Sequence, residues 1–264
     1  MIGLVLAGCG SPAATGGSVL SDIPTQPFPE TTTAITPATT TPSPAPPAAA
    51  PVVVLNPGHN GGNGGHAKEI GRQVPAGGGK TKECDTTGTQ TNAGYPEHAF
   101  TWDVTLKARA ALEAKGVKVV LTREDDSGVG PCVDARAGIG NKAGAAAVVS
   151  IHADGSTTAD ARGFHVAYPE PPLNAAQGEP SAKLAKQLRD GLSTSGFTPA
   201  NYIGSNGLDG RNDLAGLNLS ERPAVFVECG NMRDAAEAAV LSSDDGRQRY
   251  ATAIAAALLA YVGR

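Results

Sequence analysis

The stretch VVVLNPGH, residues 52–59, decides the expected fold, because a short β-branched apolar run ends abruptly at Asn-Pro-Gly. Runs of this kind are typical of strands that are buried on both faces of a sheet. Four later segments have the same character, at residues 117–121, 146–151, 164–167 and 224–227. The sequence therefore predicts a sheet of buried strands whose first strand ends beside His59.

Helical segments alternate with these strands. Apolar residues recur at helical spacing in three segments, residues 97–115, 181–195 and 247–262. Strands and helices in alternation predict an α/β fold of three layers, in which helices flank a mostly parallel, twisted sheet. Ligands of such sheets bind beyond the carboxyl ends of the strands. His59, His152 and Glu228 all fall at or just after predicted strand ends.

The chain divides by composition into a linker and a catalytic domain. Residues 10–51 are rich in Pro, Thr and Ala and poor in large apolar side chains. Because such a segment buries too little apolar surface to offset its ordering entropy, we expect it to be disordered. Residues 52–264 are expected to form one catalytic domain, which is large enough for a hydrophobic core.

The first nine residues, MIGLVLAGC, resemble the end of a lipoprotein signal peptide. In that interpretation LAGC at residues 6–9 is the lipobox and Cys9 is the lipidated residue. The alternative is an ordinary cleaved signal peptide in which Cys9 has no role. Both interpretations predict an exported protein of the periplasm or cell wall, and the first adds a lipid anchor to the membrane.

The composition argues against two kinds of interaction. The formal net charge is -4 and Lys and Arg form no cluster, whereas nucleic-acid binding depends on a basic patch. No segment approaches the roughly 20 apolar residues that a membrane-spanning helix needs. We therefore expect a soluble, monomeric catalytic domain.

Three residues far apart in the chain are candidate metal ligands: His59, Glu97 and His152. Two imidazoles and one carboxylate are a common ligand set for catalytic zinc, which keeps a fourth position open for water. Glu228 ends an apolar run and would be the carboxylate that accepts a proton from that water. The set predicts a zinc hydrolase, although each residue taken singly would be unremarkable.

The ligand on the first helix is ambiguous from the residues alone. Glu97 and His98 are neighbours behind Pro96, which suits the first position of a helix. Successive side chains point about 100° apart around a helix, so only one of the two can face the metal. His66 and His165 lack comparable surroundings and are given no role.

Because the protein is expected to be exported, its cysteines can form disulfides. Cys84 lies in a Gly-rich connection and Cys132 in a turn, so both are expected at the surface, whereas Cys229 follows a strand and should be buried and free. A disulfide between Cys84 and Cys132 would close a loop of about 49 residues and stabilise the fold by about 4 kcal/mol on chain-entropy grounds. A zinc site made of cysteines is disfavoured because the sequence has no C-x-x-C spacing.

The chain resembles the zinc-dependent N-acetylmuramoyl-L-alanine amidases of the type 3 amidase family, and most of all their compact stand-alone actinobacterial members. The resemblance runs from about Val52 to the C-terminus. It rests on segments in matching order: NPGH at 56–59, EHAFTW at 97–102, LTR at 121–123, the Arg-containing helix at 136–141, SIHA at 150–153 and RPAVFVECGN at 222–231.

This resemblance implies one zinc ion per chain, held by His59, Glu97 and His152, with Glu228 as the catalytic carboxylate. It also chooses Glu97 over His98. The chain departs from the family at two positions, since the family usually has Asp at the position of Asn56 and Asn at that of Asp154. The partners of the two His ligands are therefore expected to differ from the family pattern, and such partners commonly change metal affinity about 10–100-fold.

The implied reaction is hydrolysis of the amide between N-acetylmuramic acid and L-alanine of the stem peptide, in peptidoglycan or muropeptides. Zinc would polarise the scissile carbonyl, and Glu228 would take the proton of the attacking water and return it to the alanine nitrogen. Arg123, Arg211 and backbone amides near Gly230 are candidates to bind the anionic intermediate or the stem-peptide carboxylates. A surface or helix-pairing role is the alternative for each Arg.

Two other functions stay open at this point. A zinc peptidase that acts on peptidoglycan cross-links would use the same four residues. A solute-binding lipoprotein would also have Cys9, a Pro-rich linker and an α/β body, but it would need two lobes and would not need Glu228 beside a metal. Residues 61–94 are expected to be a long loop that could lie over the cleft and gate it.

Overall fold

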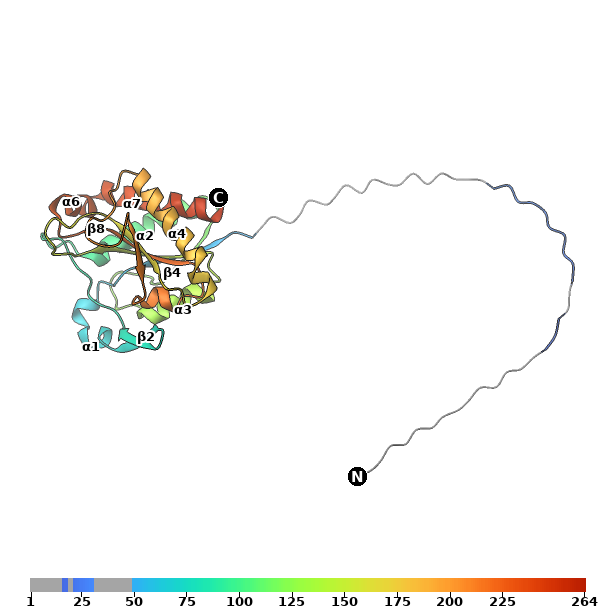
Figure 1. Ribbon diagram of the computed structural model, residues 1–264, viewed down its shortest axis with the longest axis horizontal. Helices are drawn as coiled ribbons and strands as arrows, with labels where there is room; N and C mark the ends of the chain where they lie inside the picture. Colours follow the sequence, from blue (N-terminus) through green and yellow to red (C-terminus); the bar gives the residue numbers. More distant parts are fainter. Residues whose placement is uncertain (1–15, 19–20, 31–48) are drawn as a thin grey trace, which may run out of the picture. The chain divides into compact units, whose positions relative to one another are not determined.

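The computed structural model describes residues 16–18, 21–30 and 49–264. Residues 49–264 belong to one compact unit (Figure 1). In the preceding unit, residues 16–18 and 21–30 are exposed and contain neither helix nor strand. The proposed lipobox and Cys9 lie outside the described residues. None of the helices in the described part of the chain is long and apolar enough to cross a membrane.

A six-stranded sheet forms the middle layer, in the order β4-β1-β5-β8-β6-β7. Its strands are β1 (Val52–Pro57), β4 (Lys118–Leu121), β5 (Ala147–Asp154), β6 (His165–Pro169), β7 (Leu208–Arg211) and β8 (Ala224–Asn231). All neighbours pair in parallel except β6 and β8, which are antiparallel. The predicted fold class, a three-layer α/β domain with a mostly parallel sheet, is confirmed.

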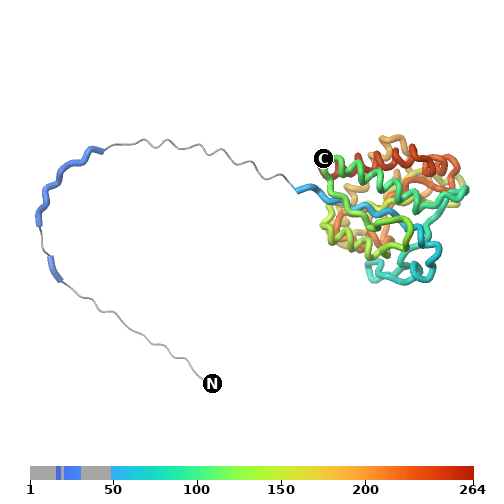
Figure 2. The backbone as a smooth tube through the Cα atoms, turned by 180° about the vertical axis from the view of Figure 1, so that it is seen from behind, coloured from blue at the N-terminus to red at the C-terminus, as the bar shows by residue number. Residues whose placement is uncertain are grey.

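Helices cover both faces of this sheet. Three long helices pack together on one face, with α7 in contact with the other two (Figure 2). They are α2 (Glu97–Glu113), α4 (Glu179–Thr194) and α7 (Asp244–Val262), and α6 (Ala235–Ser242) leads into α7. The opposite face carries α3 (Val133–Lys142) and the short α5 (Ala215–Asn218).

The first strand shows why its sequence is apolar at successive positions. Val53 and Leu55 pack into the larger core beneath the three long helices, while Val54 points to the smaller core beneath α3 and α5. All three side chains are completely buried. A strand that is covered on both faces favours apolar side chains along its length. Polar residues return near its carboxyl end, where Asn56 begins the NPGH segment.

The expectation of a long loop at residues 61–94 was wrong. The segment contains a 3-10 turn (Asn63–Gly65), the short α1 (Ala67–Ile70) and an antiparallel hairpin of β2 (Gln73–Gly77) and β3 (Lys80–Glu83). The sequence signal is weak because the hairpin packs by one face only: Val74 and Ala76 are buried, while β3 is mostly exposed and polar. The hairpin contacts α3 and α5.

Cys84 and Cys132 are joined by a disulfide, as the sequence favoured. The expectation that both lie at the surface was wrong, since their exposed fractions are 1% and 8%. The reason is the hairpin, whose Val74 packs with both cysteines in a small apolar cluster that Val133 completes. Cys229 is buried and free, as predicted.

Candidate metal centre

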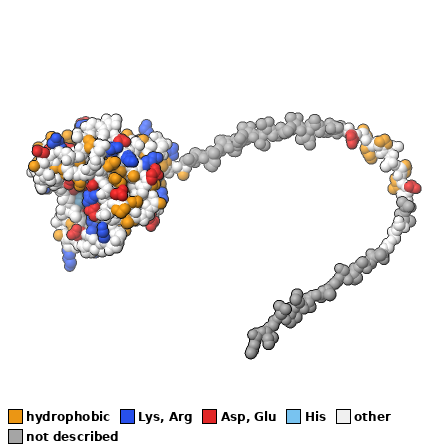
Figure 3. Space-filling model, in the orientation of Figure 1, with side chains coloured by type: hydrophobic (Ala, Val, Ile, Leu, Met, Phe, Trp, Pro, Cys, Tyr) orange, Lys and Arg blue, Asp and Glu red, His pale blue; other side chains and the backbone are white. Residues whose placement is uncertain are grey.

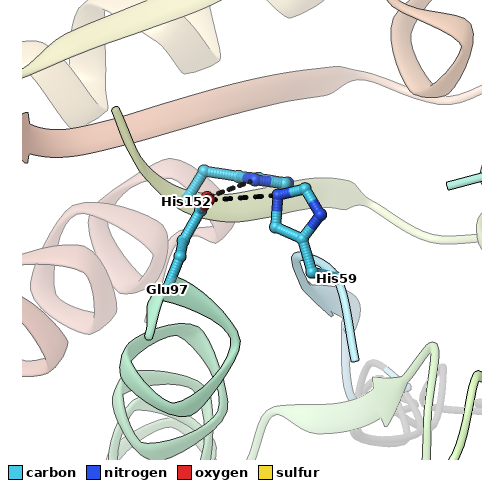
Figure 4. A group of neighbouring side chains, drawn as sticks. All are labelled: His59, Glu97 and His152. Carbon is cyan, nitrogen blue, oxygen red and sulfur yellow. Dashed lines mark hydrogen bonds and ion pairs between the residues drawn. The ribbon is translucent and has the colours of Figure 1, made fainter. Parts of the chain in front are cut away.

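His59, Glu97 and His152 come together from three different elements. His59 lies two residues beyond β1, Glu97 is the first residue of α2, and His152 lies near the carboxyl end of β5. One ligand atom of each lies within 4.8 Å of the others. Figure 4 shows the Glu97 carboxylate reaching both rings: Oε1 is 2.9 Å from His152 Nδ1, and Oε2 is 3.2 Å from His59 Nε2. Two imidazoles and a carboxylate thus share one small space.

The helix start presents Glu97 and not His98 to this group. Pro96 has extended backbone and is the N-cap of α2, whereas the sequence suggested that it would be the first helical residue. Glu97 follows it in the first turn. His98 turns away, and its Nδ1 lies 2.8 Å from Asp126 Oδ2. The choice that the residues left open follows from the direction of the helix.

Gly58 leaves space for the His152 ring close to the end of β1, beside His59. A Cβ built at this position would lie 2.1 Å from His152 Cε1, so no side chain fits there without moving the ring. The next residue, His59, has φ of 57°, which is a left-handed conformation that non-glycine residues rarely adopt. The backbone turns sharply at the end of β1 and so directs the His59 ring toward Glu97.

The outward nitrogens of the two rings have different partners. His59 Nδ1 lies 3.2 Å from Asp85 Oδ1 and 3.1 Å from the carbonyl oxygen of Thr86. His152 Nε2 lies 3.2 Å from Ser150 Oγ, and the ring stacks on Phe226 with centroids 3.9 Å apart. Asp85 was missed from the sequence because nothing about a polar residue beside a cysteine indicates a contact with a histidine 26 positions away.

The charges of the three residues depend on one another. Burial disfavours a charged His59 ring, but the Glu97 and Asp85 carboxylates outweigh this effect and raise the pKa of His59 to about 10. Burial would raise the pKa of Glu97, whereas the two imidazoles hold that pKa well below its usual range. Burial lowers the pKa of His152. The Glu97 carboxylate is thus favoured in its anionic form by the two imidazoles that contact it.

Glu228 lies beside this group on the neighbouring strand. Residues His152 of β5 and Glu228 of β8 are paired in the parallel register. Glu228 Oε2 is buried and has no hydrogen-bond partner among the described residues. Burial, and then the charges of Glu97 and Asp154, raise the pKa of Glu228 well above its usual value. A carboxylate without partners in this position is prepared to accept a proton.

The two positions that depart from the family pattern both have partners in the structure. Asn56 Nδ2 donates to Ser150 Oγ over 2.8 Å, which links it to the outer side of His152. Asp154 Oδ2 accepts a hydrogen bond of 2.6 Å from the Tyr202 hydroxyl. Tyr202 was not singled out from the sequence, because the loop that carries it has no periodic pattern.

The two candidate substrate-binding arginines do not line the cavity at this site. Arg123 is buried and donates to the carbonyl oxygens of Pro57 and His98, so it fixes the end of β1. Arg211 at the end of β7 pairs with two nearby carboxylates, Asp209 and Asp213. These contacts of Arg123 are with backbone carbonyl oxygens, and a substrate-binding role of either arginine stays a prediction.

A cavity of about 290 Å³ opens over the three candidate ligands and Glu228. Its lining includes the apolar residues Val133, Leu214, Ala215 and Phe226, while Lys82 and Glu83 extend the cavity to the hairpin. On the face in Figure 3, basic and acidic side chains are interspersed. The cavity is large enough for a small part of a polymeric substrate.

The domain is thus a three-layer α/β fold in which two imidazoles from strand ends and a carboxylate from a helix start form a group that could hold a metal ion. The chain belongs to the N-acetylmuramoyl-L-alanine amidase family, whose model matches residues 53–260. It is 54% identical over 203 residues to the N-acetylmuramoyl-L-alanine amidase Rv3717 of Mycobacterium tuberculosis, a match that covers 77% of this chain and 83% of that protein.

Solved structures give the same assignment. The N-acetylmuramyl-L-alanine amidase Ami1 of Mycobacterium smegmatis is 52% identical, with a TM-score of 0.79 over 81% of this chain and 98% of that chain. The N-acetylmuramoyl-L-alanine amidase AmiC2 of Nostoc punctiforme is more distant, at 25% identity and a TM-score of 0.62 over 82% of this chain and all of that chain. The six-stranded fold is thus common to near and distant relatives.

Proposed function

We propose that this protein is a zinc-dependent peptidoglycan hydrolase that cleaves the amide between N-acetylmuramic acid and L-alanine of the stem peptide. The observation that carries the proposal is the His59–Glu97–His152 group, which opens to a cavity with Glu228 alongside. Membership of the amidase family and 54% identity to a curated amidase support the choice of bond.

The donor set fits zinc. Each imidazole turns one nitrogen toward Glu97 and the other toward a separate partner, so one nitrogen of each ring and a carboxylate oxygen are directed to the same space. These three donors leave room for water, as catalytic zinc requires. When bound, zinc would polarise the scissile carbonyl and make water acidic near neutral pH.

Glu228 would carry the proton during the reaction. Its carboxylate is adjacent to the ligand group and Oε2 has no other partner, so it can accept the proton of the water that attacks the carbonyl. Once protonated, Glu228 can donate that proton to the leaving alanine nitrogen.

The same four residues could also serve a zinc peptidase, and the products distinguish the two activities. Mass spectrometry of muropeptides after incubation with the purified zinc-loaded protein should show free L-alanine amino ends on the stem peptides. A new amino group at any other residue would favour the peptidase. A solute-binding lipoprotein would leave the muropeptides intact.

Export and anchoring form a separate part of the proposal. Peptidoglycan lies outside the cytoplasm, so the enzyme must be exported, and Cys9 could hold it to the membrane through a linker at residues 10–51. Full-length protein should then fractionate with membranes, and Cys9→Ala should release it with unchanged activity on soluble muropeptides. Wild-type protein found only in the soluble fraction, with its N-terminus beyond Cys9, would refute the anchor alone.

A further inference from the structure

Asp85 lies behind one of the candidate ligands but outside every sequence motif of the site. Its Oδ1 is 3.2 Å from His59 Nδ1, the nitrogen on the far side of the ring from Glu97. A histidine that binds metal through Nε2 must carry its proton on Nδ1, where an acceptor can hold it. Asp85 supplies an anionic acceptor at that position.

The Asp85 carboxylate is itself held in place. Arg136 Nη2 lies 3.1 Å from Asp85 Oδ2, and the amide of Thr86 donates to Oδ1 over 2.7 Å. Arg136 also donates to the carbonyl oxygen of His59 over 3.1 Å. The same guanidinium therefore fixes both the backbone of His59 and the carboxylate behind its ring.

The disulfide closes this arrangement. Cys84 precedes Asp85, and Cys132 is the N-cap of α3, the helix that carries Arg136 one turn later. The carbonyl oxygen of Cys84 accepts a hydrogen bond of 2.8 Å from the amide of Val133, which adds a second link between the two segments. Asp85 and Arg136 are thus brought together from segments about 50 residues apart by covalent and backbone bonds.

His59 needs such support because its backbone is left-handed. A non-glycine residue with φ of 57° persists when the surrounding contacts determine its conformation. The ring contacts Asp85 and Thr86, and the carbonyl oxygen contacts Arg136. Removing the carboxylate would loosen the ring without removing any ligand atom.

We propose that Asp85 is a positioning residue for His59, whose carboxylate selects the Nδ1–H form of the ring and so sets the metal affinity of the site. The inference rests on the proposed metal centre. Partners of this kind typically change metal affinity about 10–100-fold. Asp85→Asn and Asp85→Ala should therefore bind zinc about 10–100-fold more weakly than wild type, as measured by competition with a chelator on the purified full chain.

The chain contains a matched control. Asp126 also joins a histidine Nδ1 to a buried arginine, since its carboxylate lies 2.8 Å from His98 and 3.0 Å from Arg123. Because His98 is turned away from the ligand group, Asp126→Asn should keep wild-type zinc affinity. A loss of affinity in Asp126→Asn equal to that in Asp85→Asn would mean that general loosening of the fold, and not the contact with His59, lowers the affinity.

Two further readouts separate positioning from a purely structural role. Replacing zinc with cobalt gives an absorption spectrum that reports ligand geometry, and this spectrum should change in Asp85→Asn but not in Asp126→Asn. The melting temperature of the metal-free Asp85→Asn protein checks that the near-isosteric variant still folds if Asp85→Ala does not. Wild-type affinity and spectrum in Asp85→Asn would show that the carboxylate charge is not needed and would overturn the proposal. The Thr86 carbonyl lies as close to Nδ1 as Asp85 does, so the same result in Asp85→Ala would show that Thr86 suffices as the acceptor. Wild type that binds no zinc would instead refute the metal centre.

Discussion

His59 and His152 offer the same chemistry, but two different regions of the molecule hold them. His152 lies within β5, which is paired on both sides by β1 and β8, and its ring is stacked on Phe226. His59 lies beyond the end of β1 in a left-handed turn, and its ring depends on the segment that follows Cys84. The sheet therefore holds one ligand through its regular hydrogen bonds, and long-range contacts with a disulfide-linked loop hold the other.

The strongest test of this comparison removes each ring in turn. His59→Ala and His152→Ala should both lose bound zinc and hydrolysis, because a site with two protein ligands holds the metal poorly. Zinc content and muropeptide hydrolysis are the measurements. His98→Ala is the control and should keep both, since that ring contacts Asp126 instead. Full activity with one zinc per chain in either ligand variant would contradict the assignment.

Glu228→Gln should separate metal binding from proton transfer. The amide is nearly isosteric with the carboxylate but cannot accept a proton at neutral pH, so turnover should fall by roughly 10²–10⁴-fold while zinc content stays near one per chain. The sheet would then hold a ligand and a proton carrier side by side on β5 and β8. If the variant loses zinc as well, Glu228 is a metal ligand.

The same contrast explains how much could be predicted. The part of the site on the sheet, with His152 and Glu228, was predictable because buried strands such as residues 224–227 are apolar without interruption. Glu228 marks the point where that pattern ends. The segment around Cys84 that holds His59 was not predictable, because the hairpin buries only one face and the burial of Cys84 depends on a contact with Val74. The contact between Asp85 and His59 likewise depends on tertiary structure, which no periodicity in a polar segment encodes.

Removal of the disulfide should selectively affect the segment after Cys84 that holds His59. Replacing Cys84 and Cys132 together with Ser should lower the free energy of unfolding by about 4 kcal/mol on chain-entropy grounds. The measurements are calorimetric melting and hydrogen exchange, and exchange should accelerate around residues 84–86 while β5 stays protected. Equal acceleration in β5 would show that the two regions are not independent. Two free thiols at these positions in native, oxidised protein would remove the premise.

Ser150→Ala removes the hydroxyl behind the His152 ring, and its expected effect on zinc affinity is the smallest of these variants. Ser150 Oγ is the neighbour of His152 Nε2, and it accepts a hydrogen bond from Asn56, whose Oδ1 in turn accepts hydrogen bonds from Thr122 and Arg136. Loss of the hydroxyl leaves the Asn56 amide without its acceptor, which should cost about 1–3 kcal/mol of stability. The stacking on Phe226 and the ladder of β5 should still hold the ring, and no charge is lost. Zinc affinity, measured by chelator competition, should therefore fall less than about tenfold, which is below the range expected for Asp85→Asn. An equal or larger loss in Ser150→Ala would show that the sheet alone does not position His152, and that both imidazoles depend on the partner behind the ring.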